Sequence, residues 1–282
     1  MKGFINIIKP EGGSSAFAVG AVKKKFHIPC GHMGTLDPMA SGVLPVGIGK
    51  TSRLFQFMLE KDKEYVAEFA FGTLTDTLDK TGKVTASTDI LPTERVIKDS
   101  LPFFIGEIDQ VPPNYSAKCI DGKRGYELAR RGIEFTLKPK KVTVLSFDYL
   151  GQTAENTYKF KIACKGGTYI RSLCRDLGER CGSLATMVSL DRTKSGVFDY
   201  ANGVTLEEFK ASHNPEKYLL PADMAVDYKK AILTNAQATK ILNGVFDDLG
   251  YQDGLYRVYN GDDFWGVGES IDGILKIKAY VR

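Results

Sequence analysis

The sequence has 282 residues, of which 43% are hydrophobic and 26% charged, and a formal net charge of +4. This composition and a mean hydropathy of -0.17 fit a globular protein with a sizeable core and exclude a disordered or collagen-like chain. No stretch approaches the roughly 20 apolar residues that cross a bilayer, and the N-terminus reaches a lysine and a proline too early for a signal peptide. We therefore expect a cytoplasmic protein with no membrane partner.

The N-terminal part begins with short apolar runs separated by glycine-rich turns. The run at residues 4–8 is short and β-branched and predicts a strand. Ser14 or Ser15 is placed to cap a helix whose apolar side chains recur at helical spacing as far as Phe26. The pattern disappears over residues 27–42, and a Gly- and Pro-rich loop of that length is usually functional in a compact domain.

The middle of the chain alternates strands with single helical segments. Further strands are predicted at residues 43–48, 65–71, 142–150 and 158–164, and helical segments at residues 53–59 and 125–132. Thr168 is expected to cap another helix, which directs Ile170, Leu173, Cys174 and Leu177 inward. Because there is no steady βαβ repeat, this order indicates an α+β protein with a mixed, mainly antiparallel sheet flanked by helices.

We expect a boundary between two domains near residues 221–227. Beyond it, a predicted helix at residues 235–243 is followed by short strands with Gly and Asp turns, a pattern typical of a small β-rich module. We therefore expect a large domain at residues 1–225 and a small C-terminal module at residues 226–282.

The cysteines and histidines give no sign of a disulfide framework or a metal site. The cysteines are odd in number and contain no C-x-x-C pair, which indicates buried free thiols; they are Cys30, Cys119, Cys164, Cys174 and Cys181. The three histidines lack the spacing of metal ligands. We therefore expect no bound metal.

The net charge is unevenly distributed along the chain. Between Lys118 and Arg180, fourteen Lys and Arg stand against seven Asp and Glu, so this segment carries +7 and the rest of the chain -3. Such an uneven charge distribution is typical of a protein that binds phosphate groups. A solvated surface of an ordinary enzyme gives the same count, so both interpretations stay open.

The hexapeptide GIGKTS at residues 47–52 is similar to part of a phosphate-binding loop. The complete pattern requires a glycine five residues before Gly49, where this sequence has Leu44 followed by Pro45. The backbone N–H cradle for a nucleotide is therefore missing, and the motif does not predict an NTPase.

Asp37 and His32 lie in the loop GHMGTLDPMASG at residues 31–42. Pro38 disfavours the α region for Asp37 and presents its carboxylate from an extended backbone, where it can act as a nucleophile or a base. An Asp-Pro pair also starts ordinary turns, and the local features alone favour that alternative. His32 is a candidate base, although a lone histidine in such a loop more often makes a structural or ligand hydrogen bond.

A second candidate segment is KGGTYIRSL at residues 165–173. Its glycines allow a ligand to approach the N-terminus of the helix that follows. Tyr169 and Arg171 are two positions apart, so one can pack while the other reaches a carboxylate, and an arginine beside a buried aspartate keeps that aspartate ionised. An ordinary helix start with a surface arginine fits the local sequence at least as well.

Six segments in one order carry a family resemblance over residues 3 to about 225. They are KPEGGSS at residues 9–15, GHMGTLDPMASGVLP at 31–45, DKEY at 62–65, FGTLTDTLDKTGKV at 71–84, PPNYSAKCIDGKRGYELARRG at 112–132 and GGTYIRSLCRDLG at 166–178. Together they closely resemble the bacterial tRNA pseudouridine-55 synthases, the TruB family.

The resemblance implies a pseudouridine synthase fold with a small PUA-like, RNA-binding C-terminal module. Asp37 is similar to the family's essential aspartate and Arg171 to the arginine that pairs with it. Tyr65 corresponds to a tyrosine that stacks on the base, and Tyr169 to a tyrosine that packs on the site. His32 corresponds to a histidine that enters the space of the extruded nucleotide. Leu190 corresponds to a leucine of the uracil pocket, and Lys9 to a structural lysine.

The implied reaction converts the T-loop uridine of tRNA to pseudouridine, so the expected partner is the tRNA T-arm, and we expect a monomer. Uracil is detached, turned and rejoined through C5 without redox change, hydrolysis or a group donor, and therefore no cofactor is expected. Attack of Asp37 on C1′, attack on C6 and a glycal intermediate all use the same residues and stay open.

Two positions depart from the family pattern. The family usually has Ser-Ala-x-Lys, whereas here Ser116-Ala117 are followed by Lys118 and then Cys119, so the lysine is shifted by one position or lost. Asp191-Arg192 follows Leu190 where two basic residues are commoner. Two other functions are compatible with a basic surface. One is an RNA-binding chaperone that helps tRNA fold, which does not need Asp37; the other is a guide-RNA-dependent rRNA pseudouridine synthase, which predicts lysine-rich tails that this sequence lacks.

Overall fold

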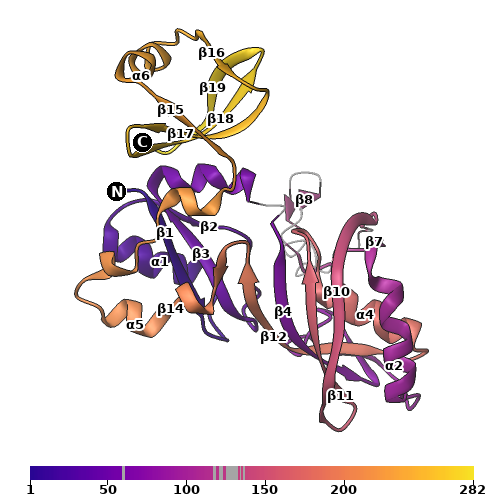
Figure 1. Cartoon of the computed structure of the whole chain (residues 1–282). Helices are drawn as coiled ribbons and strands as arrows, with labels where there is room; N and C mark the ends of the chain where they lie inside the picture. Colours follow the sequence, from indigo (N-terminus) through magenta and orange to yellow (C-terminus); the bar gives the residue numbers. More distant parts are fainter. Residues whose placement is uncertain (59–60, 117–118, 121–122, 125–132, 134, 136) are drawn as a thin grey trace. The chain divides into compact units, whose positions relative to one another are not determined.

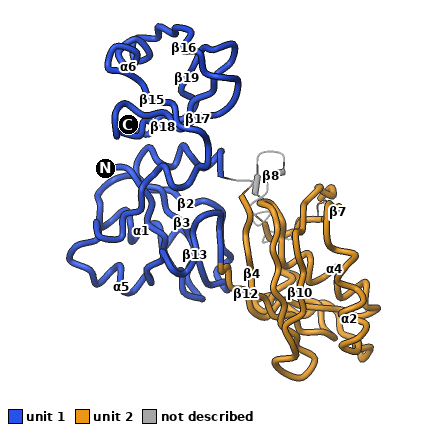
Figure 2. The backbone as a smooth tube through the Cα atoms, in the orientation of Figure 1, with its two compact units in different colours: residues 1–59, 194–282 blue, residues 60–193 orange. Residues whose placement is uncertain are grey.

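The structure is a computed structural model that describes residues 1–282 except 59–60, 117–118, 121–122, 125–132, 134 and 136. It forms two compact units: unit 1 contains residues 1–59 and 194–282, and unit 2 contains residues 60–193 (Figures 1 and 2). Both units combine mainly antiparallel strands with a few short helices, which confirms the α+β class. Among the described residues, no helix combines the length and apolar character needed to span a membrane.

Residues 1–59 and 194–225 of unit 1 contain adjacent strands in the order β14-β1-β3, and β2 pairs with β3. The strands of this part are β1 Gly3–Lys9, β2 Cys30–His32, β3 Ser41–Ile48, β13 Phe198–Asp199 and β14 Val204–Thr205. The helices of this part are α1 Ser15–Phe26, η1 Gly49–Phe57, η3 Tyr200–Asn202, α5 Leu206–Ala211, η4 Pro215–Tyr218 and η5 Ala222–Ala225. β1 runs antiparallel to β3 and parallel to β14.

The beginning of α1 follows the sequence prediction closely. Ser14 is the N-cap, and its hydroxyl accepts a hydrogen bond from the Phe17 backbone N–H at 3.1 Å. Lys23, Lys24 and Lys25 lie in the last turn, where positive charge is favourable to the helix dipole. The predicted strands at residues 4–8 and 43–48 are also present, as the interior of β1 and β3.

Two segments of unit 1 differ from their predictions. The expected loop at residues 27–42 contains the short strand β2, because Cys30, Gly31 and His32 pair with the end of β3. Three residues are too few to show an alternating pattern, so only the pairing partner reveals the strand. The predicted helix at residues 53–59 is a 3-10 segment that begins earlier, at Gly49.

The C-terminal part of unit 1 is a five-stranded sheet in the order β15-β17-β18-β19-β16, which confirms a β-rich module. Its elements are β15 Lys229–Leu233, α6 Asn235–Leu242, β16 Asp248–Tyr251, β17 Gly254–Asn260, β18 Asp263–Ile271 and β19 Gly273–Tyr280. Tyr259, Phe264 and Val267 belong to the same buried apolar cluster as Phe4 and Val43. The likeness to a PUA module and the boundary at residue 225 stay predictions.

Unit 2 is built on a sheet with strand order β12-β4-β11-β10-β7. Its elements are β4 Lys63–Phe71, β5 Thr73–Thr75, β6 Val84–Ser87, α2 Glu94–Ser100, η2 Leu101–Phe104, β7 Gly106–Gln110, β8 Cys119–Ile120, β9 Lys123–Arg124, β10 Lys140–Ala154, β11 Thr157–Cys164, α4 Ile170–Arg180 and β12 Ala185–Ser195. The last two residues of β12, Lys194 and Ser195, belong to unit 1. The helical turn predicted at residues 125–132 lies outside the described residues.

Buried and half-buried residues alternate along β4 and β11, and the buried ones form the core of unit 2. One residue in two is buried along both strands, and the buried rings of Phe69 and Phe160 have centroids 4.9 Å apart. The face of α4 that was predicted to point inward is buried, with Ile170, Leu173, Cys174 and Leu177. The sheet and α4 together fix the position of the first helical turn, which carries Arg171.

Candidate functional site

The Asp37 carboxylate projects from a turn that is fixed on both sides. The Ala40 backbone N–H donates to the Asp37 carbonyl at 3.0 Å, so Asp37 begins a four-residue turn with Pro38 at its second position. Gly34, three residues earlier, has a φ of 78°, a conformation that favours glycine. The turn that local features favoured is therefore present, and Asp37 is half-buried within it.

Lys9 and Ser15 hold this turn from the side of β1 and α1. The Lys9 ammonium, which is 1% exposed, donates to the carbonyls of Pro10 and Gly13 at 2.7 Å and of Pro38 at 3.4 Å. The Ser15 hydroxyl donates to the Leu36 carbonyl at 3.0 Å and accepts from the Leu36 N–H at 2.9 Å. Residues on both sides of Asp37 are thus anchored, which supports the structural role expected for Lys9.

Replacing Lys9 with Met should destabilise unit 1. The substitution keeps the apolar stem but leaves three carbonyls without a charged donor, a loss of about 3 kcal/mol. Trp265, the only tryptophan and 1% exposed, reports unfolding of the same unit by fluorescence in urea. Lys24→Met on the exposed face of α1 is the control. An unchanged midpoint for Lys9→Met would contradict the anchoring role.

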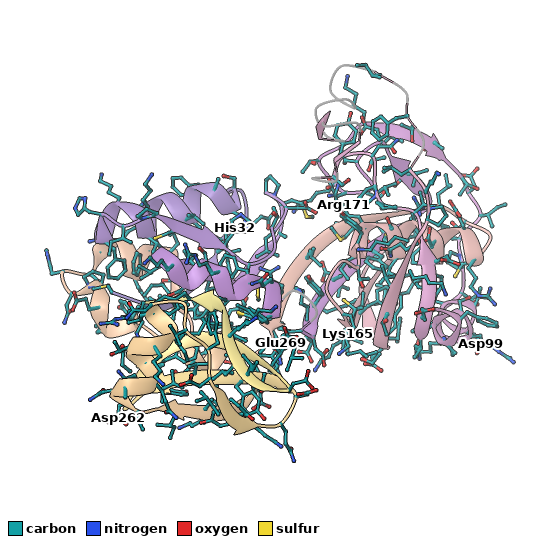
Figure 3. The ribbon with its side chains drawn as sticks, turned by 90° about the horizontal axis from the view of Figure 1, so that it is seen from above. His32, Asp99, Lys165, Arg171, Asp262 and Glu269 are labelled. Carbon is teal, nitrogen blue, oxygen red and sulfur yellow. The ribbon has the colours of Figure 1, made fainter. Side chains whose placement is uncertain are left out.

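His32 lies on β2, opposite Val46 of β3, rather than in an irregular loop (Figure 3). It is half-buried, and the neighbouring Met33 is 1% exposed. A strand partner fixes the backbone of His32, so the sheet sets the direction in which the side chain leaves the strand.

Tyr65 and Leu190 lie on neighbouring strands of unit 2. Tyr65 is in β4 and Leu190 in β12, which are adjacent in the sheet, and each side chain is 7% exposed. Tyr65 is opposite Ile162 of β11, on the buried face of β4. The structure therefore brings a tyrosine and a leucine into one region of the sheet.

Two cationic side chains near Tyr65 and Leu190 were not proposed as site residues from the sequence, although Arg192 was noted there as part of a departure from the family pattern. Lys63 is 8% exposed and Arg192 is 1% exposed. Burial, and after it the positive charge of Arg192, lower the pKa of Lys63 to about 8. The sequence does indicate that Lys63 is buried, because it is in phase with Tyr65 and the other buried residues of β4.

Arg171 is the second residue of α4 and is bound on three sides within unit 2 (Figure 3). Its guanidinium donates to the Thr77 carbonyl at 2.9 Å and to the Tyr115 carbonyl at 3.1 Å. It forms an ion pair with the Asp79 carboxylate at 3.5 Å, and the two side chains are 6% and 5% exposed. The alternative of a surface arginine is therefore wrong.

Asp79 is held in place by its neighbours in the segment after β5. One carboxylate oxygen accepts hydrogen bonds from the Thr77 hydroxyl at 2.8 Å, the Thr81 N–H at 3.0 Å and the Thr81 hydroxyl at 2.6 Å. The backbone of this segment docks on β12, because the Lys80 N–H donates to the Met187 carbonyl at 2.9 Å. Asp79 was missed because its partner Arg171 lies far away in the sequence.

The helix N-terminus at Tyr169 differs from the prediction in its cap. Tyr169, not Thr168, is the N-cap of α4, and its side chain makes no capping bond. The Thr168 hydroxyl donates to the Lys165 carbonyl at 2.9 Å instead. The Tyr169 N–H donates to the Gln110 side chain at 2.8 Å. A residue from β7 thus holds the backbone of the N-cap residue, and the side-chain cap predicted from the sequence is absent.

The cysteines are free thiols where the structure describes their side chains. Burial raises the pKa of Cys164 to about 11 and that of Cys174 well above its usual value, so both stay protonated at neutral pH and are poor nucleophiles. Cys30 and Cys181 are half-buried. Across the described ranges, no three His, Cys, Asp or Glu side chains are grouped as a metal site.

The geometry thus supplies two sets of groups, each in its own unit. Unit 1 presents an anchored carboxylate at Asp37, and unit 2 contains a tyrosine, a leucine and a buried arginine–aspartate pair. A carboxylate can attack an electrophilic carbon, and a tyrosine face can stack on a base.

Family models cover most of the chain. The model described as "TruB family pseudouridylate synthase (N terminal domain)" matches residues 23–170. The model described as "tRNA pseudouridylate synthase B C-terminal domain" matches residues 171–227.

Individual relatives match over the full length. The chain is 40% identical to the tRNA pseudouridine synthase B of Clostridium kluyveri, over 100% of both chains. It is 38% identical to the tRNA pseudouridine synthase B of Clostridium tetani, over 98% of both chains.

Solved structures confirm the expected fold. A chain in the crystal structure of a Cbf5-Nop10-Gar1 complex matches with a TM-score of 0.70 and 27% identity, over 98% of this chain and 79% of that chain. A structure of an H/ACA RNP bound to a substrate RNA matches with a TM-score of 0.72 and 24% identity, over 99% and 85% of the two chains, and shows the fold alone.

Proposed function

Because the chain belongs to the TruB family of pseudouridylate synthases, we propose that it converts uridine 55 in the T-loop of tRNA to pseudouridine, with Asp37 as the catalytic carboxylate. The full-length identity to relatives named tRNA pseudouridine synthase B carries this proposal. The anchored turn at Asp37 supports it, since a nucleophile must be held in a fixed geometry to react efficiently.

The reaction requires few groups, and this chain offers candidates for the carboxylate, the stacking ring and the wall of the uracil pocket. The bond between C1′ and N1 breaks, the uracil turns, and a bond forms between C1′ and C5. The proton on C5 is then lost and N1 takes one up, so uridine and pseudouridine are isomers. Asp37 is the proposed carboxylate for the first step. Tyr65 is proposed to stack on the flipped base and Leu190 to line its pocket, which prevents the freed uracil from leaving; both side chains are already largely desolvated.

A uridine inside a folded RNA loop has to leave its stack before it can react. This costs a few kcal/mol, and one aromatic stacking contact returns about 1–3 kcal/mol. Tyr65 alone is therefore insufficient, and we propose that His32, Tyr169 and Arg171 contribute further contacts around the extruded nucleotide. The excess of positive charge between Lys118 and Arg180 would add attraction to the phosphates.

We infer that the partner is the T-arm of tRNA, that the enzyme acts as a monomer and that it is located in the cytoplasm with its substrate. The small C-terminal sheet, in which Lys229 and Lys230 are exposed at the start of β15, is proposed as an additional RNA-binding module of the PUA type. Binding should weaken as salt rises, because phosphate contacts release counterions.

Tritium release tests this function. Unmodified tRNA carrying tritium at C5 of uridine should release one equivalent per molecule when it is incubated with the purified protein alone. Release without added metal, cofactor or guide RNA is expected. If no tritium is released under single-turnover conditions, the proposed function is wrong.

A further inference from the structure

The backbone of Tyr169 is held by one buried side chain, that of Gln110 at the end of β7. The Gln110 side-chain carbonyl accepts from the Tyr169 N–H at 2.8 Å, and its amide donates to the Tyr169 carbonyl at 3.1 Å. Gln110 is 1% exposed, so water does not compete for these bonds. A side chain that satisfies both backbone groups of one residue fixes its position in two directions.

The orientation of the amide is set by its partners. In the opposite orientation the amide N–H would face the Tyr169 N–H, and the two carbonyl oxygens would face each other. Both contacts would be repulsive and buried, so only the observed orientation fits. Gln110 is itself fixed by its pairing with Lys140 of β10.

The residue after Gln110 extends the contact to the first turn of α4. The Val111 carbonyl accepts from the Ser172 hydroxyl at 2.8 Å and from the Arg175 guanidinium at 3.2 Å. Residues 110 and 111 therefore hold the start of α4 through its backbone and through two of its side chains. The Tyr169 side chain makes no capping hydrogen bond to α4, so the backbone at the start of the helix is held by Gln110 and not by a local cap.

We propose that Gln110 is a positioning residue for the uridine site, acting through Tyr169, an inference that rests on the proposed function. Tyr169 is placed directly before α4, and its ring can meet the extruded base reproducibly only if its backbone is fixed. Gln110 is proposed to contact the Tyr169 backbone and not the substrate or the reacting atoms. A small displacement of a positioning group costs up to about 10²-fold in rate.

Gln110→Glu tests the proposal because it preserves the shape and replaces the donor by an acceptor that repels the Tyr169 carbonyl. We expect the single-turnover rate of tritium release at saturating enzyme to fall by about 30- to 100-fold. The Kd for tRNA should change by less than about threefold, because most of the RNA contacts lie elsewhere. Gln152→Glu, the same change at an exposed position of β10, is the matched control and should retain the wild-type rate.

A double-mutant cycle with Tyr169→Leu distinguishes positioning from a general structural role. In the Tyr169→Leu background, Gln110→Glu should lower the remaining rate by less than about threefold, because the residue through which it acts is gone. The same loss in both backgrounds would overturn the proposal, and so would a full wild-type rate in Gln110→Glu. If the wild-type protein itself releases no tritium, the proposed function has failed instead.

Discussion

Replacing Asp37 with Asn is expected to lower the single-turnover rate of tritium release from tRNA by at least about 10³-fold. The amide has nearly the size of the carboxylate but cannot act as a nucleophile, so the reaction loses the group on which every proposed route depends. The Kd for tRNA should stay within about threefold of the wild-type value, since phosphate contacts dominate affinity. Asp37 lies in a turn held by backbone hydrogen bonds, so the fold should persist.

Asp89→Asn, at an exposed position of unit 2, is the control and should leave the rate unchanged. Undiminished release from Asp37→Asn would rule out the proposed mechanism. The same variant separates an enzyme from an RNA-binding chaperone, because a chaperone would keep its effect on tRNA folding with Asn at position 37. If the main function is that of a chaperone, Asp37→Asn should leave the effect of the protein on tRNA folding unchanged.

Replacing Arg171 with Ala is expected to destabilise unit 2 by about 3–5 kcal/mol, as for other buried ion pairs that lose one partner. The Asp79 carboxylate would remain 5% exposed without its cation, and the carbonyls of Thr77 and Tyr115 would lose their donor. Urea unfolding followed by circular dichroism measures the loss. The folded fraction should also release tritium far more slowly, because Arg171 belongs to the proposed uridine site.

Two comparisons make the Arg171 prediction specific. Arg95→Ala removes one partner of an exposed ion pair with Asp99, whose side chains are 90% and 71% exposed, and should leave the unfolding midpoint unchanged. The double variant Arg171→Met with Asp79→Asn should be more stable than Arg171→Ala, since no buried charge is left uncompensated. A double variant less stable than Arg171→Ala would contradict the ion-pair account.

The sequence predicted those elements whose pattern is long enough to show a period. β4 and β11 alternate over eight or nine residues, and α4 has a regular apolar face, so their buried residues could be identified in advance. β2 has three residues and depends on β3, so no local signal existed. Asp37 was a local candidate that an ordinary Asp-Pro turn outweighed, and only the family resemblance made the catalytic role the favoured interpretation.

The contacts that support the site are the part that sequence reasoning could not supply. Gln110 and Tyr169 are 59 positions apart, and Arg171 lies 94 positions from the Thr77 carbonyl that it binds. Such pairs form only when β7, the segment after β5 and the start of α4 meet in the folded chain. Lys63 is the exception, because a lysine in phase with the buried residues of a strand is visible in the sequence.

Mapping pseudouridine in a mixture of unmodified tRNAs shows which nucleotide the protein modifies and whether Asp37 is required. After incubation with the wild-type protein alone, chemical derivatisation and primer extension should report a single modified position in each tRNA, uridine 55 of the T-loop, and none after incubation with Asp37→Asn. Modification at other positions or a requirement for a guide RNA would contradict the proposed activity on uridine 55. Equal modification by Asp37→Asn would contradict the catalytic role of Asp37.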